Sequence, residues 1–178
     1  IMRSRAKAVN FGIVYGIGAF SLAKDIGVSN KEAKHYIESY LAHYSGVDSY
    51  MKNVVEKANA DGYVETMFGR RRNLPELTSS KHMIRAFGER VARNMPIQGT
   101  AADIIKIAMI KVDERMKAEN LRARLVLQVH DELIVEAPQD ESMRVALIVQ
   151  EEMENAVKMS VPLTADAAIG RTWYDAKG

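Results

Sequence analysis

The sequence contains no cysteine and no long apolar run, and each absence excludes a class of protein. Without cysteine the chain forms neither disulfides nor cysteine-ligated zinc sites, a composition that suits a reducing cytoplasm. No run reaches the 18 or more apolar residues that a membrane-spanning helix needs, so we expect no membrane partner. The first residues also lack the pattern of a secretory signal. A hydrophobic fraction of 47% and a charged fraction of 27% are typical of a globular protein.

Positive and negative side chains nearly balance, with 25 Lys or Arg against 23 Asp or Glu and a net charge of only +2. This value alone does not indicate nucleic acid, but Glu65–Asn94 carries seven Lys or Arg against three Asp or Glu. The 178 residues suffice for one domain or two small lobes. The opening residues already have a helical pattern without a cap, and we interpret them as lying inside a longer polypeptide.

Two short apolar runs surround His130, Asp131 and Glu132 in the stretch Arg124–Pro138, RLVLQVHDELIVEAP. The runs are β-branched and apolar on both faces, which predicts central strands buried on each side. The three residues between them would form a tight turn without Gly, Asn or Pro, and such a local violation often serves function. Adjacent carboxylates can bind a hard divalent cation, although a solvated acidic turn is the alternative.

A second pattern is a stripe of four residues along a helix predicted over Met2–Tyr15. Arg3, Lys7, Phe11 and Tyr15 are each four apart, so they share one face of the helix. Such a stripe is often a solvated face or the edge of a core. The order of two cations and two aromatic rings also suits a nucleoside triphosphate, whose phosphates attract cations and whose base stacks on a ring.

Two further groups could contact nucleic acid. Arg70, Arg71 and Arg72 follow Gly69 in a predicted turn, within a small hairpin or extended excursion predicted over Tyr63–Leu77, and they are either solvated or in contact with phosphates. Pro96 should break or kink the helix predicted over Ser80–Glu119. Three polar residues spaced by four lie on both sides of Met95-Pro96: Arg90, Asn94 and Gln98. They either cap the helix around the proline or read the DNA minor groove without sequence preference.

These motifs resemble those of the family A DNA polymerases, the group of bacterial DNA polymerase I. RSRAKAVNFGIVYG is similar to motif B of the family, and RLVLQVHDELIVEAP resembles motif C. ARNMPIQGTAAD and the C-terminal tail are also similar to family stretches, so the resemblance covers nearly the whole chain. It implies that Arg3 and Lys7 contact the triphosphate, that Phe11 lies against the nucleotide sugar and base, and that Tyr15 lies beside the template base.

The resemblance also implies roles for the turn and for the other polar residues. Asp131 would be a catalytic carboxylate and a magnesium ligand, Glu132 an auxiliary catalytic carboxylate, and His130 a neighbour of the primer terminus. The implied partners are primer-template DNA and deoxynucleoside triphosphates, and the implied cofactor is a pair of Mg²⁺ ions. The remaining DNA contacts would come from Arg90, Asn94, Gln98 and the arginines Arg70, Arg71 and Arg72.

The family's motif A, which supplies a second metal-binding carboxylate, has no counterpart in this sequence. We therefore expect this chain to be part of a template-directed DNA polymerase whose N-terminal part is missing, and to be inactive alone. The expected site of action is the bacterial cytoplasm, at the nucleoid. Two alternatives are a non-catalytic nucleic-acid-binding module and a structural remnant whose charges merely solvate an α+β fold.

The expected fold is α+β, with a helical fingers part over residues 1–80 and a palm part over residues 81–178. The palm part would contain a small antiparallel sheet made of the motif C hairpin and a C-terminal strand over Val161–Ile169. The other predicted helices cover Ala19–Ile26, Lys31–His43, Val47–Asp61 and Gln139–Val157.

Overall fold

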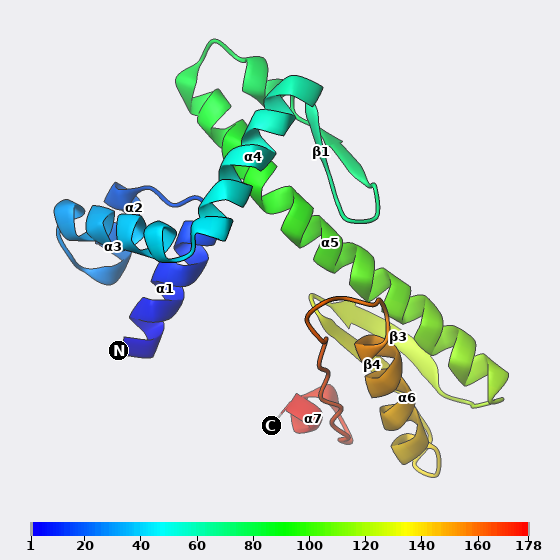
Figure 1. The fold of residues 1–178 in the computed structure, drawn as a ribbon. Helices are drawn as coiled ribbons and strands as arrows, with labels where there is room; N and C mark the ends of the chain where they lie inside the picture. Colours follow the sequence, from blue (N-terminus) through cyan, green and yellow to red (C-terminus); the bar gives the residue numbers. More distant parts are fainter. Residues whose placement is uncertain (1, 178) are drawn as a thin grey trace. The chain divides into compact units, whose positions relative to one another are not determined.

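A computed structural model describes residues 2–177 and confirms the predicted α+β class (Figure 1). Helices dominate, and the strands form two separate antiparallel pairs, β1 with β2 and β3 with β4. In chain order the elements are α1 Met2–Val14, α2 Ala19–Ile26, α3 Asn30–His43, α4 Ser45–Asp61, β1 Tyr63–Glu65, β2 Arg71–Asn73, η1 Pro75–Thr78, α5 His82–Ala118, β3 Arg124–Val129, β4 Glu132–Glu136, α6 Ser142–Glu154 and α7 Trp173–Lys177.

The chain divides into two compact units, Ile1–Thr100 and Ala101–Gly178. The boundary lies inside α5, which contributes its first part to unit 1 and its second part to unit 2. The division expected after residue 80 concerns the fingers and palm subdomains, and it stays a prediction. Within residues 2–177, none of the helices is both long and apolar enough to cross a membrane.

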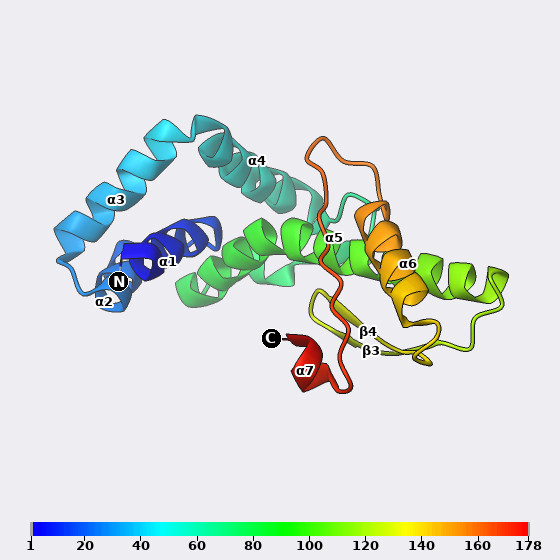
Figure 2. The same cartoon turned by 90° about the horizontal axis from the view of Figure 1, so that it is seen from below.

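The first core of unit 1 lies between α1, α2 and α3, and Figure 2 shows α3 beside the other two helices. Leu22 and Ile26 of α2 are buried against Ala33 of α3, with Val9 of α1 packed on them. The start of α3 is set locally, because the Ser29 side chain accepts a hydrogen bond from the Glu32 backbone while the Glu32 side chain accepts one from Ser29.

The second core of unit 1 joins α4, the β1–β2 hairpin, η1 and the start of α5. Its buried members are Val64, Leu74, Leu77 and two alanines of the flanking helices. The hairpin predicted in this region is confirmed, with Tyr63 paired to Asn73 and Glu65 paired to Arg71. Its position relative to α5 depends on Gly99, since a Cβ atom there would lie only 2.7 Å from Thr66 Cγ2.

Of the two alternatives predicted at Pro96, the break is wrong, because the 37-residue helix α5 continues through the proline, and the kink stays a prediction. Proline lacks one backbone donor and disfavours a helix interior by about 3 kcal/mol. Tertiary packing outweighs this, since Ala92 before the proline and Val112 after it are fully buried in two hydrophobic cores.

Unit 2 packs the β3–β4 hairpin and α6 beside the second part of α5. Val112 and Met116 of α5 meet Val145 and Ile148 of α6, and Leu125, Leu133 and Val135 of the hairpin cover them. Strands β3 and β4 pair along their length, Arg124 with Glu136 at one end and Val129 with Glu132 at the turn, with a register shift between Leu125 and Leu127.

Two sequence expectations for unit 2 are wrong. The strands are not buried on both faces, because Val126 and Leu127 are 51% and 49% exposed on a sheet of only two strands. The strand predicted over Val161–Ile169 is also wrong: this described stretch is irregular and pairs with neither β3 nor β4. Its β-branched residues have no neighbouring strand within the described chain to supply the ladder of hydrogen bonds that makes a strand.

Candidate functional site

The β3–β4 turn consists of two residues, His130 and Asp131, between the paired residues Val129 and Glu132. His130 has φ +53°, a left-handed backbone conformation that residues other than glycine rarely adopt. A positive φ at the first central residue alone is the pattern of a type II′ turn, which suits a hairpin. The Gln128 side-chain amide donates to the His130 carbonyl at 2.6 Å and supports this strained turn.

The two carboxylates at this turn have different surroundings. Asp131 is exposed, and its carboxylate forms neither a hydrogen bond nor an ion pair with any other residue in the range 2–177. Glu132 is partly buried: its Oε1 lies 3.3 Å from Lys177 Nζ, while its Oε2 is shielded from solvent without a hydrogen-bond partner among the described residues. The turn therefore presents one free carboxylate and holds the other.

Oxygen donors of this kind suit Mg²⁺, so Asp131 fits the role of one metal ligand. Across residues 2–177, however, no three His, Asp or Glu side chains gather closely enough to hold a metal ion. The donor chemistry therefore fits magnesium, whereas the number of donors is too small for a complete site.

The predicted stripe on α1 is an exposed surface. Lys7 Nζ lies 5.7 Å from the centroid of the Phe11 ring, within range of a cation–π contact. The Phe11 and Tyr15 rings follow one another with centroids 6.2 Å apart and an angle of 28° between their planes. Phe11 is 50% and Tyr15 40% exposed, and Arg3 is exposed as well. The structure thus brings all four residues together in the predicted order.

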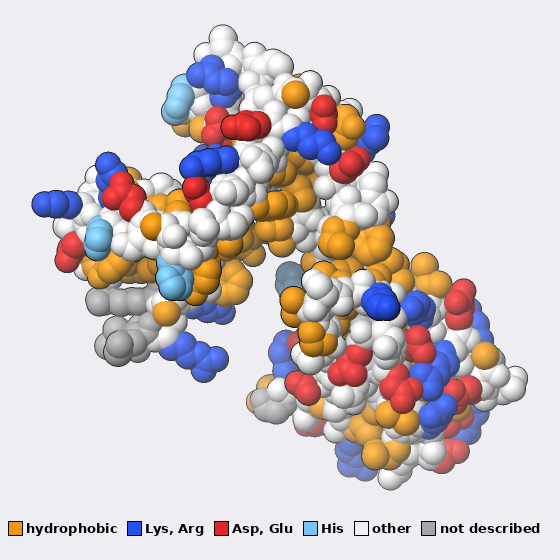
Figure 3. Space-filling view, viewed as in Figure 1, with side chains coloured by type: hydrophobic (Ala, Val, Ile, Leu, Met, Phe, Trp, Pro, Cys, Tyr) orange, Lys and Arg blue, Asp and Glu red, His pale blue; other side chains and the backbone are white. Residues whose placement is uncertain are grey.

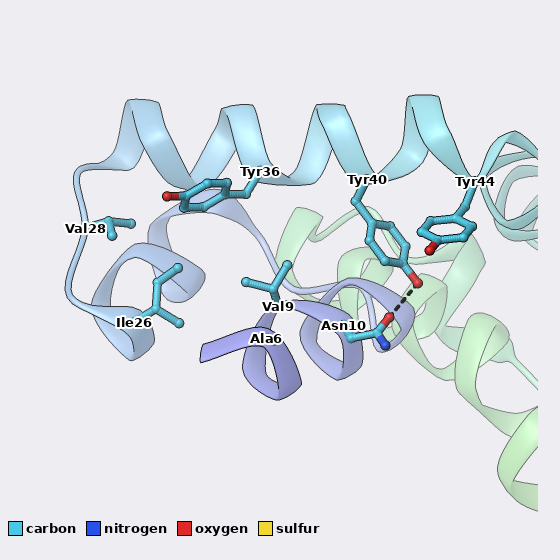
Figure 4. Close-up of a pocket in the computed structure, with 8 residues that line it drawn as sticks. All are labelled: Ala6, Val9, Asn10, Ile26, Val28, Tyr36, Tyr40 and Tyr44. Carbon is cyan, nitrogen blue, oxygen red and sulfur yellow. Dashed lines mark hydrogen bonds between the residues drawn. The ribbon is translucent and has the colours of Figure 1, made fainter. Parts of the chain in front are cut away.

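Another face of α1 explains why this stripe stays exposed. Ala6, Val9 and Asn10 face α3 across a cavity of about 430 Å³ that Tyr36, Tyr40 and Tyr44 line (Figure 4). The Tyr40 hydroxyl donates to Asn10 Oδ1 at 2.6 Å. These contacts orient α1. The three tyrosines are spaced by four, which places them on one face of α3.

The end of α1 meets the start of α5 within unit 1. Gly16 has φ +75°, and a Cβ atom there would lie 3.2 Å from Arg93 Nη1 and 3.7 Å from Arg90 Cγ. Arg90, one of the predicted DNA contacts, therefore lies next to the residue that follows Tyr15. Farther along α5, Asn94 Oδ1 is buried without a hydrogen-bond partner among the described residues, and Gln98 is exposed.

The three arginines of the β1–β2 hairpin are exposed but differ in position. Arg71 and Arg72 belong to strand β2 rather than to the turn that the sequence predicted, and the turn itself occurs at Gly69 with φ +79°. Arg71 Nε lies 3.2 Å from Glu65 Oε2, and its guanidinium lies 4.4 Å from the Tyr63 ring centroid. One face of the hairpin therefore carries an arginine that is already partly neutralised.

An ion-pair network between α5 and α6 also escaped sequence reasoning, and Figure 3 shows acidic and basic side chains side by side over unit 2. Arg115 Nη1 lies 2.7 Å from Glu151 and 2.8 Å from Glu152. The hydrogen bonds that Arg115 donates to Glu152 and Glu151 raise the pKa of Arg115. Arg144 donates to Glu119 at 2.6 Å and is the main cause of the lowered pKa of Glu119.

Comparison with known proteins decides the family. A model described as DNA polymerase family A matches residues 1–175. The chain belongs to this family. DNA polymerase I from Bacillus caldotenax is 55% identical over 176 residues, and that from Bacillus subtilis (strain 168) is 53% identical. Each match covers 99% of this chain and 20% of the relative, so the chain spans about a fifth of the length of these polymerases.

Solved structures agree with this membership of family A. The POL domain of Pol1 from M. smegmatis, in complex with DNA primer-template and dNTP, is 46% identical with a TM-score of 0.95. The match covers 99% of this chain and 31% of that one. The predicted family and the α+β fold are therefore both confirmed.

Proposed function

We propose that this chain forms part of a template-directed DNA polymerase that adds deoxynucleotides to the 3′ end of a primer by two-metal phosphoryl transfer. Residues 1–80 would belong to its fingers and residues 81–178 to its palm, and it would act in the bacterial cytoplasm at the nucleoid. The observation that carries the proposal is Asp131, which a strained two-residue turn holds exposed and unpaired in a chain of this family.

The stripe on α1 would bind the incoming deoxynucleoside triphosphate. Arg3 and Lys7 supply positive charge for the triphosphate, and the half-exposed Phe11 ring offers a face to the sugar and base. Because Lys7 already lies over the Phe11 ring, the cation and the ring are positioned together before a nucleotide arrives. Tyr15, at the end of the stripe, would lie beside the template base.

Primer-template DNA would contact α5, the β1–β2 hairpin and the β3–β4 turn. Arg90 and Gln98 are exposed on α5. The side-chain N–H groups of Asn94 and Gln98 would donate to the A N3 and T O2 acceptors of the minor groove, which A·T and T·A pairs share. The remaining contacts would come from His130 and from Arg70, Arg71 and Arg72.

In the reaction, the primer 3′-hydroxyl would lose its proton to solvent and attack the α-phosphate of the deoxynucleotide. A new P–O bond would form while the bond between the α-phosphorus and the oxygen bridging to the β-phosphate breaks, and pyrophosphate would leave with that oxygen. Asp131 would hold magnesium, with Glu132 as an auxiliary carboxylate, and magnesium would supply positive charge for the attacking and leaving oxygens. Arg3 and Lys7 would neutralise charge on the leaving pyrophosphate. Two metal ions need a further carboxylate, which we propose comes from another part of a longer polypeptide, so that residues 1–178 alone do not extend primers.

The test is primer extension with Mg²⁺ by the full-length polymerase, its Asp131→Ala variant and a matched Asp166→Ala control at an exposed loop carboxylate. We expect Asp131→Ala to lower the rate by roughly a thousand-fold or more, because a metal ligand is lost, and the control to match wild type. An Asp131→Ala rate within two-fold of wild type contradicts the assignment. A full-length protein that binds primer-template in a salt-dependent manner but never extends it would instead favour the non-catalytic binding module.

A further inference from the structure

Asp131 and Glu132 are adjacent carboxylates with unlike surroundings. The difference comes from one residue distant in the sequence. Lys177 Nζ lies 3.3 Å from Glu132 Oε1 and is the only cationic side chain that forms an ion pair with Glu132 among the described residues. The Glu132 side chain is 42% exposed, and its Oε2 atom is fully shielded.

Lys177 is the last residue of α7, and local contacts hold this short helix in place. The Thr172 backbone donates to the Asp175 carboxylate at 3.1 Å, and the Asp175 backbone donates back to Thr172 Oγ1 at 3.2 Å, as in a capping box. Gly170 packs directly on the helix, because a Cβ atom there would lie 2.5 Å from the Ala176 nitrogen. The segment therefore approaches α7 more closely than any other residue type would allow.

The ammonium group of Lys177 is also held from a second side. It lies 5.2 Å from the centroid of the Trp173 ring, one helical turn earlier in α7. A cation between a carboxylate and an aromatic face has fewer accessible positions than a free surface lysine. The Lys177 ammonium thus reaches Glu132 from a preorganised helix.

We propose that Lys177 is a positioning residue, which holds the Glu132 carboxylate against the C-terminal segment and leaves Asp131 as the carboxylate presented to the metal. The proposal rests on the proposed polymerase function and names what distinguishes the two carboxylates of its site. Without Lys177, a partly buried negative charge beside Asp131 would lose its only counter-charge among residues 2–177. The Glu132 side chain would then turn toward solvent, where it can compete with Asp131 for magnesium.

The kinetic test uses the full-length polymerase with Lys177→Met, Lys177→Arg and a matched control, Lys158→Met, at an exposed lysine without a partner among the described residues. Single-turnover incorporation is measured over a range of Mg²⁺ concentrations. For Lys177→Met we expect a rate lower by roughly three- to five-fold, the effect of losing one partly exposed ion pair, and a changed Mg²⁺ concentration at half-maximal rate. Lys177→Arg should restore both values to within two-fold, and Lys158→Met should match wild type.

A second readout needs neither metal nor activity. Hydrogen exchange of the metal-free polymerase is followed in the peptides that cover residues 124–136 and 165–177. We expect faster exchange in both peptides for Lys177→Met and exchange close to wild type for Lys177→Arg, because the ion pair links the hairpin to α7. Unchanged exchange in both peptides overturns the proposal.

The outcomes distinguish failure of the Lys177 proposal from failure of the proposed polymerase function. A Lys177→Met enzyme with a smaller active fraction but an unchanged rate and Mg²⁺ dependence per active molecule overturns positioning, since that result reflects stability alone. If wild-type polymerase does not extend primers at all, the proposed function fails, and the exchange of the two peptides decides by itself whether Lys177 holds Glu132.

Discussion

The contact between Gly99 of α5 and Thr66 of the β1–β2 hairpin leads to a prediction whose sign depends on the structure. An alanine Cβ at position 99 would lie 2.7 Å from Thr66 Cγ2, closer than real side chains approach. Thr66 cannot rotate away freely, because its buried hydroxyl accepts hydrogen bonds at 3.2 Å from the backbone of both Phe68 and Arg70. The Thr100 hydroxyl also accepts from the Met67 backbone at 3.0 Å and holds the hairpin on the helix.

Two opposing effects determine the stability of Gly99→Ala. Alanine favours a helix interior over glycine by about 1 kcal/mol. Overpacking against Thr66 should destabilise the fold by about 1–3 kcal/mol, so the net result is a loss of up to about 2 kcal/mol. Thr66→Ser deletes the clashing methyl group and keeps the hydroxyl, so in that background Gly99→Ala should stabilise by about 1 kcal/mol. The predicted coupling between the two sites is therefore about 1–3 kcal/mol.

The assay is urea denaturation of the wild-type chain, both single variants and the double variant, read as free energies of unfolding at constant slope. Gly46→Ala is the matched control, since this glycine of α4 has open space around its would-be Cβ. The control should show no coupling to Thr66→Ser. If Gly99→Ala stabilises the wild-type background as much as the Thr66→Ser background, the close packing of hairpin and helix is refuted.

Two further predictions concern the contacts that orient α1 and α6. Tyr40→Phe should lower the free energy of unfolding by about 0.5–1.5 kcal/mol, because it removes the donor to Asn10, whereas Tyr36→Phe, without such a bond among the described residues, should be near neutral in the same urea assay. The pKa of Glu119 lies below its ordinary 4.5, mainly because Arg144 donates a hydrogen bond to it. The ionised Glu119 side chain therefore stabilises the fold fully above its unfolded-state pKa, and this stabilisation disappears as the pH falls through its folded-state pKa. The stability difference between wild type and Glu119→Gln should therefore shrink below about pH 4.5, and a difference independent of pH between 3 and 7 would contradict this cause.

Local patterns in the sequence determined much of the candidate site. The α1 stripe was predictable because four-residue spacing places side chains on one face of any helix, whatever surrounds it. The β3–β4 turn was predictable for a similar reason, since two apolar runs separated by three polar residues leave little room for anything but a hairpin. The helix predicted over Lys31–His43 corresponds to α3, whose start is local as well, because hydrogen bonds between Ser29 and Glu32 connect residues three apart. The motifs at these positions also carried the family, which the comparisons confirmed.

Tertiary structure alone decided the features that depend on residues far apart in the chain. Pro96 stays helical because buried neighbours outweigh its local preference, and Val161–Ile169 is not a strand because strand formation needs a partner, whatever its own residues favour. The unequal states of Asp131 and Glu132 are likewise invisible in the sequence HDE. They arise from Lys177, and a charge pair acts through distance in space, which only the folded chain sets.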